Sequence, residues 1–209
     1  NGIGVASIMT ILSSDTISHP PIEALFTIDE ETGMTGALNL KGGLLKGKIL
    51  LNLDTEDDNE LTIGCAGGID VTATGGYTLE AAPPNVVFCS IQVKGLTGGH
   101  SGMDIYKGRG NANKIMNRVL VGAFEKFGIQ IASIDGGSLR NAIPRESVSE
   151  VVVGEKDLDT FMAYIKTIEK ELKFEYKTTD PNFSLSTSPI ETKKRVLQKG
   201  FQAKLLKSL

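Results

Sequence analysis

Apolar residues in the first third of the chain recur with two different periods, which predicts alternating helices and strands. Residues 2–13 carry apolar side chains at helical spacing. Continuous apolar runs at 22–28 and 48–54 indicate buried strands, and a short helix is expected after Glu31. Such alternation is typical of an α/β layer with parallel strands, and we expect residues 1–67 to form one.

After the glycine-rich stretch at 64–68 the pattern changes. Strands are predicted at 69–74, 86–93, 129–134 and 147–153, and amphipathic helices at 111–126 and 157–172. This order predicts that residues 68–209 form an α+β domain with a largely antiparallel sheet and two helices on one face. Residues 173–190 are polar and contain two prolines, so we expect a loop or a disordered connection there.

The last segment, residues 191–209, has six lysines and arginines against a single acid. One interpretation is a basic amphipathic helix that binds a membrane surface or a partner. The interpretation we favour is a helix that docks on its own domain through four apolar residues, with the lysines as its solvated face. These four are Val196, Leu197, Phe201 and Leu205.

Composition excludes several classes of protein. A net charge of -3 gives no reason to expect nucleic acid as a partner, and no apolar run is long enough to span a bilayer. Two cysteines are too few for a disulfide framework, and no signal peptide is visible, so we expect a cytoplasmic protein. The chain starts without Met and already in a helical pattern, which suggests that it was cut from a longer one.

Adjacent carboxylates follow the first predicted strand. In extended chain Glu30 and Glu31 would point opposite ways, so that one faces a metal ion and the other a metal-bound water. Asp54 closes the next predicted strand, and the carboxyl ends of parallel strands meet at one edge of a sheet. Zn²⁺, Mn²⁺ and Co²⁺ accept such ligands, so a metal site is the hypothesis. The alternative is that these acids lie on solvated loops.

Two glycine-rich loops carry further candidates. His100 lies between glycines, where an imidazole is free to donate a hydrogen bond to a developing oxyanion. Arg140 and Asn141 precede a strand and suit a substrate carboxylate or backbone. Each of these residues is also compatible with a turn that has no chemical role. His19, the only other histidine, reads as a surface residue, and glycines at 108–110 lack a phosphate-binding pattern.

Taken together, several motifs resemble one family. They are Asn1-Gly-Ile-Gly4, Thr27-Ile-Asp-Glu-Glu-Thr-Gly33, Leu51-Asn-Leu-Asp54, Gly98-Gly-His-Ser-Gly102 and Leu139-Arg-Asn-Ala-Ile-Pro144. The combination, over roughly residues 1–170, is similar to the aminoacyl-histidine dipeptidases. These belong to the di-zinc metallopeptidase clan that includes peptidase T and acetylornithine deacetylase.

The resemblance implies a role for each candidate. Glu30 would be the general base that takes a proton from a metal-bridging water, while Glu31 and Asp54 would each hold one of two zinc ions. His100 would belong to a lid domain and stabilise the oxyanion. Asn141 would line the substrate site, beside Arg140.

The chain also departs from the family pattern. Of the five metal ligands that the resemblance implies, only Glu31 and Asp54 are found, so we expect a central fragment that is inactive alone. Residues 1–67 would then be part of the catalytic domain, and residues 68–209 a lid that forms homodimers and is itself incomplete at its C-terminus. The expected activity is hydrolysis of Xaa-His dipeptides; a tripeptidase, an N-acyl amino acid deacylase and a non-catalytic dimerisation module are the alternatives.

Overall fold

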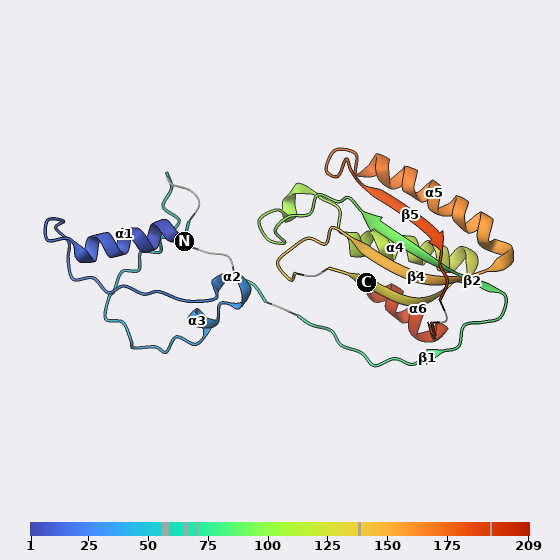
Figure 1. The fold of residues 1–209 in the computed structure, drawn as a ribbon, viewed down its shortest axis with the longest axis horizontal. Helices are drawn as coiled ribbons and strands as arrows, with labels where there is room; N and C mark the ends of the chain where they lie inside the picture. Colours follow the sequence, from blue (N-terminus) through green and yellow to red (C-terminus); the bar gives the residue numbers. More distant parts are fainter. Residues whose placement is uncertain (56–58, 65–66, 70, 138, 193) are drawn as a thin grey trace. The chain divides into compact units, whose positions relative to one another are not determined.

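The computed structural model describes residues 1–209 except 56–58, 65–66, 70, 138 and 193. The chain divides into two compact units, Asn1–Val71 (unit 1) and Thr72–Leu209 (unit 2) (Figure 1). This division lies four residues beyond the boundary predicted after residue 67.

Unit 1 contains one regular helix and two short ones. Helix α1 (Gly2–Ser13) confirms the prediction for residues 2–13, and its first turn is capped by Asn1, whose side-chain oxygen accepts a hydrogen bond from the Gly4 N–H at 2.8 Å. Helices α2 (Glu30–Gly33) and α3 (Thr35–Leu38) occupy the position of the predicted short helix.

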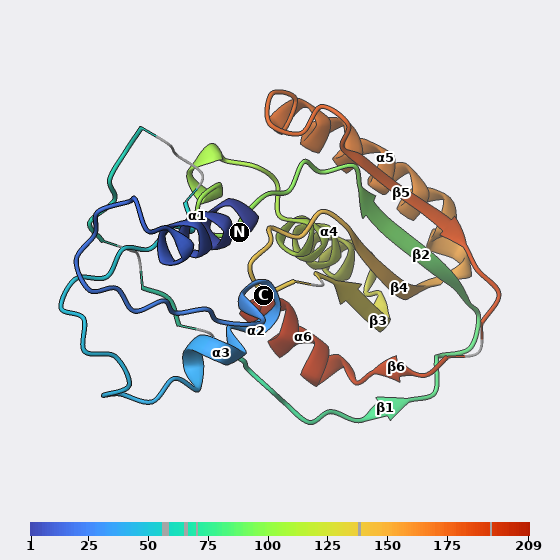
Figure 2. The ribbon, with the colours of Figure 1, turned by 60° about the vertical axis from the view of Figure 1, so that its left-hand side comes forward.

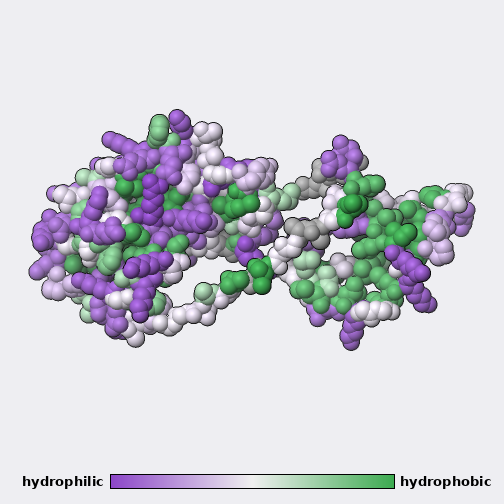
Figure 3. Space-filling model, turned by 180° about the vertical axis from the view of Figure 1, so that it is seen from behind, coloured by the Kyte–Doolittle hydropathy of each residue, from purple (hydrophilic) through white to green (hydrophobic). Residues whose placement is uncertain are grey.

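The described residues of unit 1 form no strand, so the strands predicted at 22–28 and 48–54, and the parallel layer built from them, are wrong. A strand is stable only when a neighbouring strand satisfies its backbone N–H and C=O groups. Neither run has such a neighbour within the described part of the chain, and the apolar side chains that predicted burial are exposed, Ile28 at 72% and Ile49 at 84%. The surface of unit 1 is accordingly apolar over broad areas (Figure 3).

Unit 2 is built on a four-stranded sheet in the order β3-β4-β2-β5. Strands β2 (Val86–Lys94), β3 (Gln130–Gly136), β4 (Ser147–Gly154) and β5 (Ser184–Pro189) pair only antiparallel. The predicted antiparallel sheet is therefore confirmed. The strand predicted at 69–74 is wrong for the residues of it that are described; β1 (Leu79–Glu80) comes later and pairs with β6 (Val196–Leu197) in a separate two-stranded sheet.

Two long helices cover the same face of this sheet (Figure 1). Helix α4 (Ala112–Phe127) packs on β2, β3 and β4, and α5 (Leu158–Glu175) packs on β4, β5 and α4, as predicted. Short 3-10 turns, η1 (Ile105–Lys107) and η2 (Glu155–Asp157), precede them. The apolar stripes of α4 and α5 bury some of the largest core side chains, among them Phe161, Leu120 and Ile165.

Strand β5 corrects the loop predicted at 173–190, and helix α5 also extends three residues into that range. The sequence of β5 is Ser-Leu-Ser-Thr-Ser-Pro, and only Leu185 is buried, so an alternating apolar pattern that would predict a strand is missing. As an edge strand it needs backbone partners on one side only, and a proline at its end is tolerated. Strand β5 therefore forms because it pairs with β2, and not because its own sequence favours a strand.

The C-terminal segment docks on unit 2, which confirms the interpretation favoured from the sequence. Val196 and Leu197 are buried, and Phe201 and Leu205 of helix α6 (Lys199–Ser208) pack against the core. Helix α6 lies against α4 and β3 (Figure 2). Its fully buried Gln202 accepts a hydrogen bond from the Ile131 N–H at 2.7 Å and donates one to the Ile129 carbonyl at 2.9 Å. This side chain thus pairs with the start of β3 as a neighbouring strand would.

Candidate functional site

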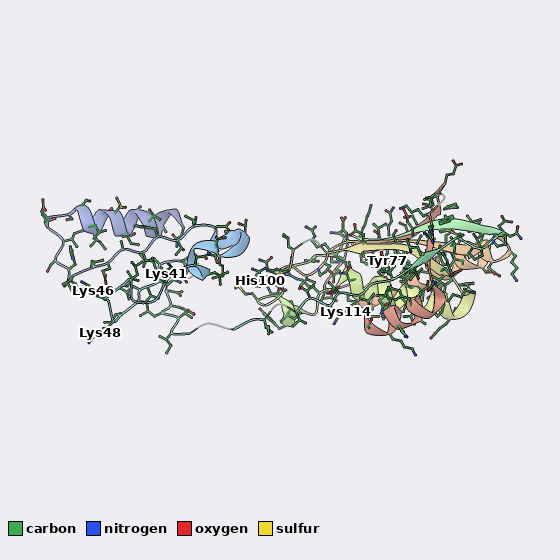
Figure 4. All side chains as sticks on the ribbon, turned by 90° about the horizontal axis from the view of Figure 1, so that it is seen from below. Lys41, Lys46, Lys48, Tyr77, His100 and Lys114 are labelled. Carbon is green, nitrogen blue, oxygen red and sulfur yellow. The ribbon has the colours of Figure 1, made fainter. Side chains whose placement is uncertain are left out.

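The loop between β2 and α4 carries His100 (Figure 4). It turns at two glycines with positive φ, Gly98 at 67° and Gly99 at 142°. A Cβ atom at Gly99 would lie 2.4 Å from the Arg109 guanidinium and 2.5 Å from the Asp104 carboxylate. Both the backbone conformation and the close packing therefore require glycine here.

The His100 imidazole is held by its own loop. Its Nδ1 lies 3.0 Å from the Gly102 nitrogen and 3.1 Å from the Met103 nitrogen, and both N–H groups donate to it. A nitrogen that accepts from backbone N–H groups carries no proton, so a neutral ring has its proton on Nε2. His100 is exposed, which leaves this Nε2–H available as a hydrogen-bond donor.

Asp104 braces the same loop from inside. Its carboxylate accepts a hydrogen bond from the His100 N–H at 2.8 Å and forms ion pairs with Lys107 at 2.6 Å and Arg109 at 3.4 Å. The bonds from the Lys107 ammonium and the His100 amide hold the pKa of Asp104 below its usual value. Arg109 in turn donates to the Gly98 carbonyl at 2.6 Å.

The loop with Arg140 and Asn141 lies directly beside the His100 loop. The Ser101 N–H donates to the Asn141 carbonyl at 2.8 Å, and the Ile143 N–H donates to the Gly99 carbonyl at 2.8 Å. His100 itself forms an isolated antiparallel bridge with Ala142. The structure therefore brings together the two loops that were predicted to carry site residues, one with His100 and the other with Arg140 and Asn141, and all three residues are exposed.

An open hollow of about 450 Å³ lies between these two loops and the start of α4. It is lined by Ser101, Ile105, Asn111, Asn113, Gly137, Leu139, Arg140, Ala142, Ile143 and Pro144. Asn111 caps α4, since its side chain accepts from the Asn113 and Lys114 N–H groups. Polar and apolar side chains thus share one concave surface, as in sites for small molecules.

Asp180 fixes the two ends of the His100 loop. One carboxylate oxygen accepts the Thr97 N–H and the other accepts the Gly110 N–H, each at 2.8 Å, and the side chain is only 1% exposed. Burial raises the pKa of Asp180, but hydrogen bonds from these two backbone amides outweigh it and hold the pKa below its ordinary value. Sequence reasoning missed Asp180 because nothing local marks a contact made 70 residues away.

The predicted carboxylates lie in unit 1. Glu30 and Glu31 occupy the first turn of α2, so they are about 100° apart on a helix rather than on opposite sides of a strand end. Asp54 is in irregular chain near the start of α1, where its carboxylate accepts a hydrogen bond from the Asn1 side chain at 3.1 Å. All three carboxylates are exposed.

The donor set of these residues is incomplete for a metal ion. Within the part of the chain that the structure describes, no group of three or more His, Cys, Asp or Glu side chains is placed to hold one. Carboxylate oxygen is a suitable donor for zinc, cobalt or manganese, but two acids alone do not make a zinc site. A metal held by Glu31 and Asp54 therefore stays a prediction.

Comparisons with known proteins support the resemblance that the motifs predicted. Residues 91–180 match the family described as the peptidase dimerisation domain. The chain is 39% identical over 197 residues to the cytosol non-specific dipeptidase of Escherichia coli, which covers 94% of this chain and 41% of that protein. It also matches the crystal structure of aminoacylhistidine dipeptidase from Vibrio alginolyticus, with 39% identity, a TM-score of 0.78 and coverage of 100% of this chain and 42% of the other.

The resemblance to aminoacylhistidine dipeptidase is therefore confirmed, and it extends beyond residue 170 to the whole chain. The chain spans about two fifths of the length of these relatives. None of the helices described is both long and apolar enough to cross a membrane.

Proposed function

We propose that this chain is part of a metal-dependent dipeptidase that hydrolyses Xaa-His dipeptides. The observation that carries the proposal is the pairing of the His100 loop with the Asn141 loop beside one hollow, in a chain that resembles aminoacylhistidine dipeptidase over its full length. The relative from Escherichia coli is named a cytosol enzyme, which supports a cytoplasmic location.

Unit 2 would bind and orient the substrate. The Nε2–H of His100 is a fixed donor that suits the oxyanion formed when water adds to a peptide carbonyl. Asn141 and Arg140 lie on the loop that is hydrogen-bonded to the His100 loop, and their amide and guanidinium donors suit the backbone and the carboxylate of a dipeptide. Of these donors Arg140 lines the hollow, and the neighbours Ser101 and Ala142 bring the loops of His100 and Asn141 to its edge; the hollow has room for a small peptide.

Unit 1 would supply the proton transfer. Glu30 would accept a proton from the attacking water and pass it to the leaving amine, and exposure leaves its carboxylate accessible for this. Glu31 and Asp54 would each contribute a carboxylate to one of two divalent ions, most simply zinc, with cobalt or manganese as alternatives. When bound, such ions polarise the scissile carbonyl and increase the acidity of water.

A dipeptidase assay on a protein of the relatives' length that contains this chain tests the proposal. We expect metal-dependent hydrolysis of alanyl-histidine, loss of at least 10³-fold in kcat with Glu30→Gln and unchanged metal content in that variant. Full activity of Glu30→Gln, or no turnover of any dipeptide, would refute it.

Two other functions are tested by the same protein. A substrate panel with tripeptides and N-acyl amino acids separates a tripeptidase or deacylase from a dipeptidase. The match of residues 91–180 to a dimerisation domain favours a homodimer formed through unit 2. A non-catalytic dimerisation module predicts that this chain self-associates and that Glu30, Glu31 and Asp54 are dispensable, so sedimentation and the Glu30→Gln assay together decide between them.

A further inference from the structure

We infer that Asp180 is a positioning residue for His100, which holds the imidazole in its Nε2–H form by pinning both ends of the loop that carries it. The role of His100 toward substrate rests on the proposed function above. The hold on the ring is a property of this chain alone.

The loop is closed by a single carboxylate. Thr97 and Gly110 are 13 positions apart in the sequence, yet their N–H groups donate to the two oxygens of Asp180, each at 2.8 Å. The Thr97 hydroxyl also donates to the Thr179 carbonyl at 2.7 Å, so the start of the loop is attached to two successive residues. A loop with its ends held together in this way is a compact unit whose interior packs on itself.

Contacts inside the closed loop determine the state of the ring. The Gly102 and Met103 N–H groups reach Nδ1 only while the backbone from His100 to Met103 stays folded back on itself. Asp104 holds that turn by accepting the His100 N–H, and Arg109 attaches the turn to Gly98. Ser101 and Gly99 also tie the loop to its neighbour, so we expect opening of its ends at Thr97 and Gly110 to loosen the turn from His100 to Met103.

A charged carboxylate is required for this clamp. Each oxygen accepts one N–H from a different end of the loop. An asparagine offers only one acceptor oxygen, and its NH₂ group would face the second N–H donor. Asp180→Asn has nearly the same shape, so it removes one end of the clamp with little change in packing.

The chain has two histidines, so the tautomer of His100 can be measured with His19 as an internal reference. His19 has the opposite arrangement, since its Nδ1 lies 2.7 Å from the Pro20 carbonyl oxygen, which can only accept. We expect ¹⁵N-histidine NMR of the 209-residue chain, at a pH where imidazole is neutral, to show His100 as a single Nε2–H tautomer. His19 lies in unit 1, and its signals should be the same in every variant of unit 2.

Asp180→Asn should convert His100 to an average of both tautomers and speed amide hydrogen exchange at Gly102 and Met103 by about tenfold or more. Gln202→Met is the control, because it removes two buried side-chain-to-backbone hydrogen bonds elsewhere in unit 2, at the start of β3, whereas Asp180→Asn removes one. It should leave the tautomer and both exchange rates unchanged. Unchanged His100 signals in Asp180→Asn, or an equal response to Gln202→Met, would overturn the inference.

A measurement on the unmodified chain covers the case in which Asp180→Asn does not fold. If the loop opens as one unit, the amides of Thr97, Gly110, Gly102 and Met103 exchange with the same opening free energy. Exchange at Gly102 and Met103 that is tenfold faster than at Thr97 and Gly110 would contradict the clamp. An inactive full-length enzyme with a fixed His100 tautomer would instead refute only the proposed function.

Discussion

Units 1 and 2 both have runs of apolar residues, yet among the residues that the structure describes only those of unit 2 form a sheet and a buried core. The run at 48–54 in unit 1 has four apolar residues in seven and β2 in unit 2 has six in nine, but the leucines of the first are exposed while Ile91 and Val93 of β2 are fully buried. The difference is that β2 has β4 and β5 as hydrogen-bonded neighbours and α4 above it. An apolar run is thus a candidate for a strand, and its partners decide whether it becomes one.

The largest expected effect compares one phenylalanine from each unit. Phe161→Ala removes a fully buried ring that packs edge-on against Phe127, with 5.7 Å between ring centres. It should lower the free energy of unfolding of unit 2 by about 3–5 kcal/mol. Phe26→Ala in unit 1 removes a side chain that is 48% exposed and should cost less than about 1 kcal/mol. Urea denaturation of the two variants measures both; equal losses would contradict the difference in core packing.

Asp180 gives the next largest effect and one that depends on pH. Its folded pKa lies below the unfolded value of about 3.9, so its stabilisation is fully present above that value and is lost as pH falls through the folded pKa. Asp180→Asn should therefore cost about 1.5–3 kcal/mol near neutral pH, and less below about pH 4. Urea denaturation of unit 2 at both pH values measures this change.

The exposed acid Asp54 of unit 1 serves as its control. Asp54→Asn should change the free energy of unfolding by less than about 0.5 kcal/mol at neutral pH. A cost of Asp180→Asn that stayed constant as the pH fell would show that the charge of the carboxylate has no part in the clamp.

The elements that the sequence predicts correctly are those with a strong apolar pattern of their own, and those it misses depend on a neighbouring element. The helices at 112–127 and 158–175 and the strands at 86–94 and 147–154 have strong periodic patterns, and all four were predicted. Strand β5 has no such pattern and exists because β2 needs a neighbour on that side.

The candidate site shows the same limit. His100 and Asn141 were found because glycine loops and polar donors are local signals. The hydrogen bonds that join their loops, and the reach of Asp180 to Thr97, depend on tertiary contacts and have no counterpart in the local sequence. Sequence reasoning therefore named the donors without showing how they are held.

Gly99→Ala tests whether the packing of unit 2 extends into the His100 loop. The new Cβ would meet Arg109 and Asp104 at a φ of 142°, and both side chains would have to shift. We expect a loss of about 1–2 kcal/mol in the free energy of unfolding and a weaker Asp104–Arg109 pair. Gly108→Ala is the control, since it has a positive φ of 67° but nothing within 4 Å of the new atom. A smaller loss in Gly99→Ala than in the control would show that the loop is not tightly packed.

The smallest expected effect tests whether the apolar run at 48–54 of unit 1 is exposed. Leu51→Ser replaces an apolar side chain that is 79% exposed, so it should change the free energy of unfolding by less than about 0.5 kcal/mol. Leu185→Ser in β5, where the leucine is 2% exposed, should lower the free energy of unfolding several times more. This is expected even though β5 is mostly polar and the run around Leu51 is mostly apolar. A large loss in Leu51→Ser would mean that residues 48–54 are buried in solution against some partner. The contrast in burial between the two units, on which the comparison of their apolar runs rests, would then not hold.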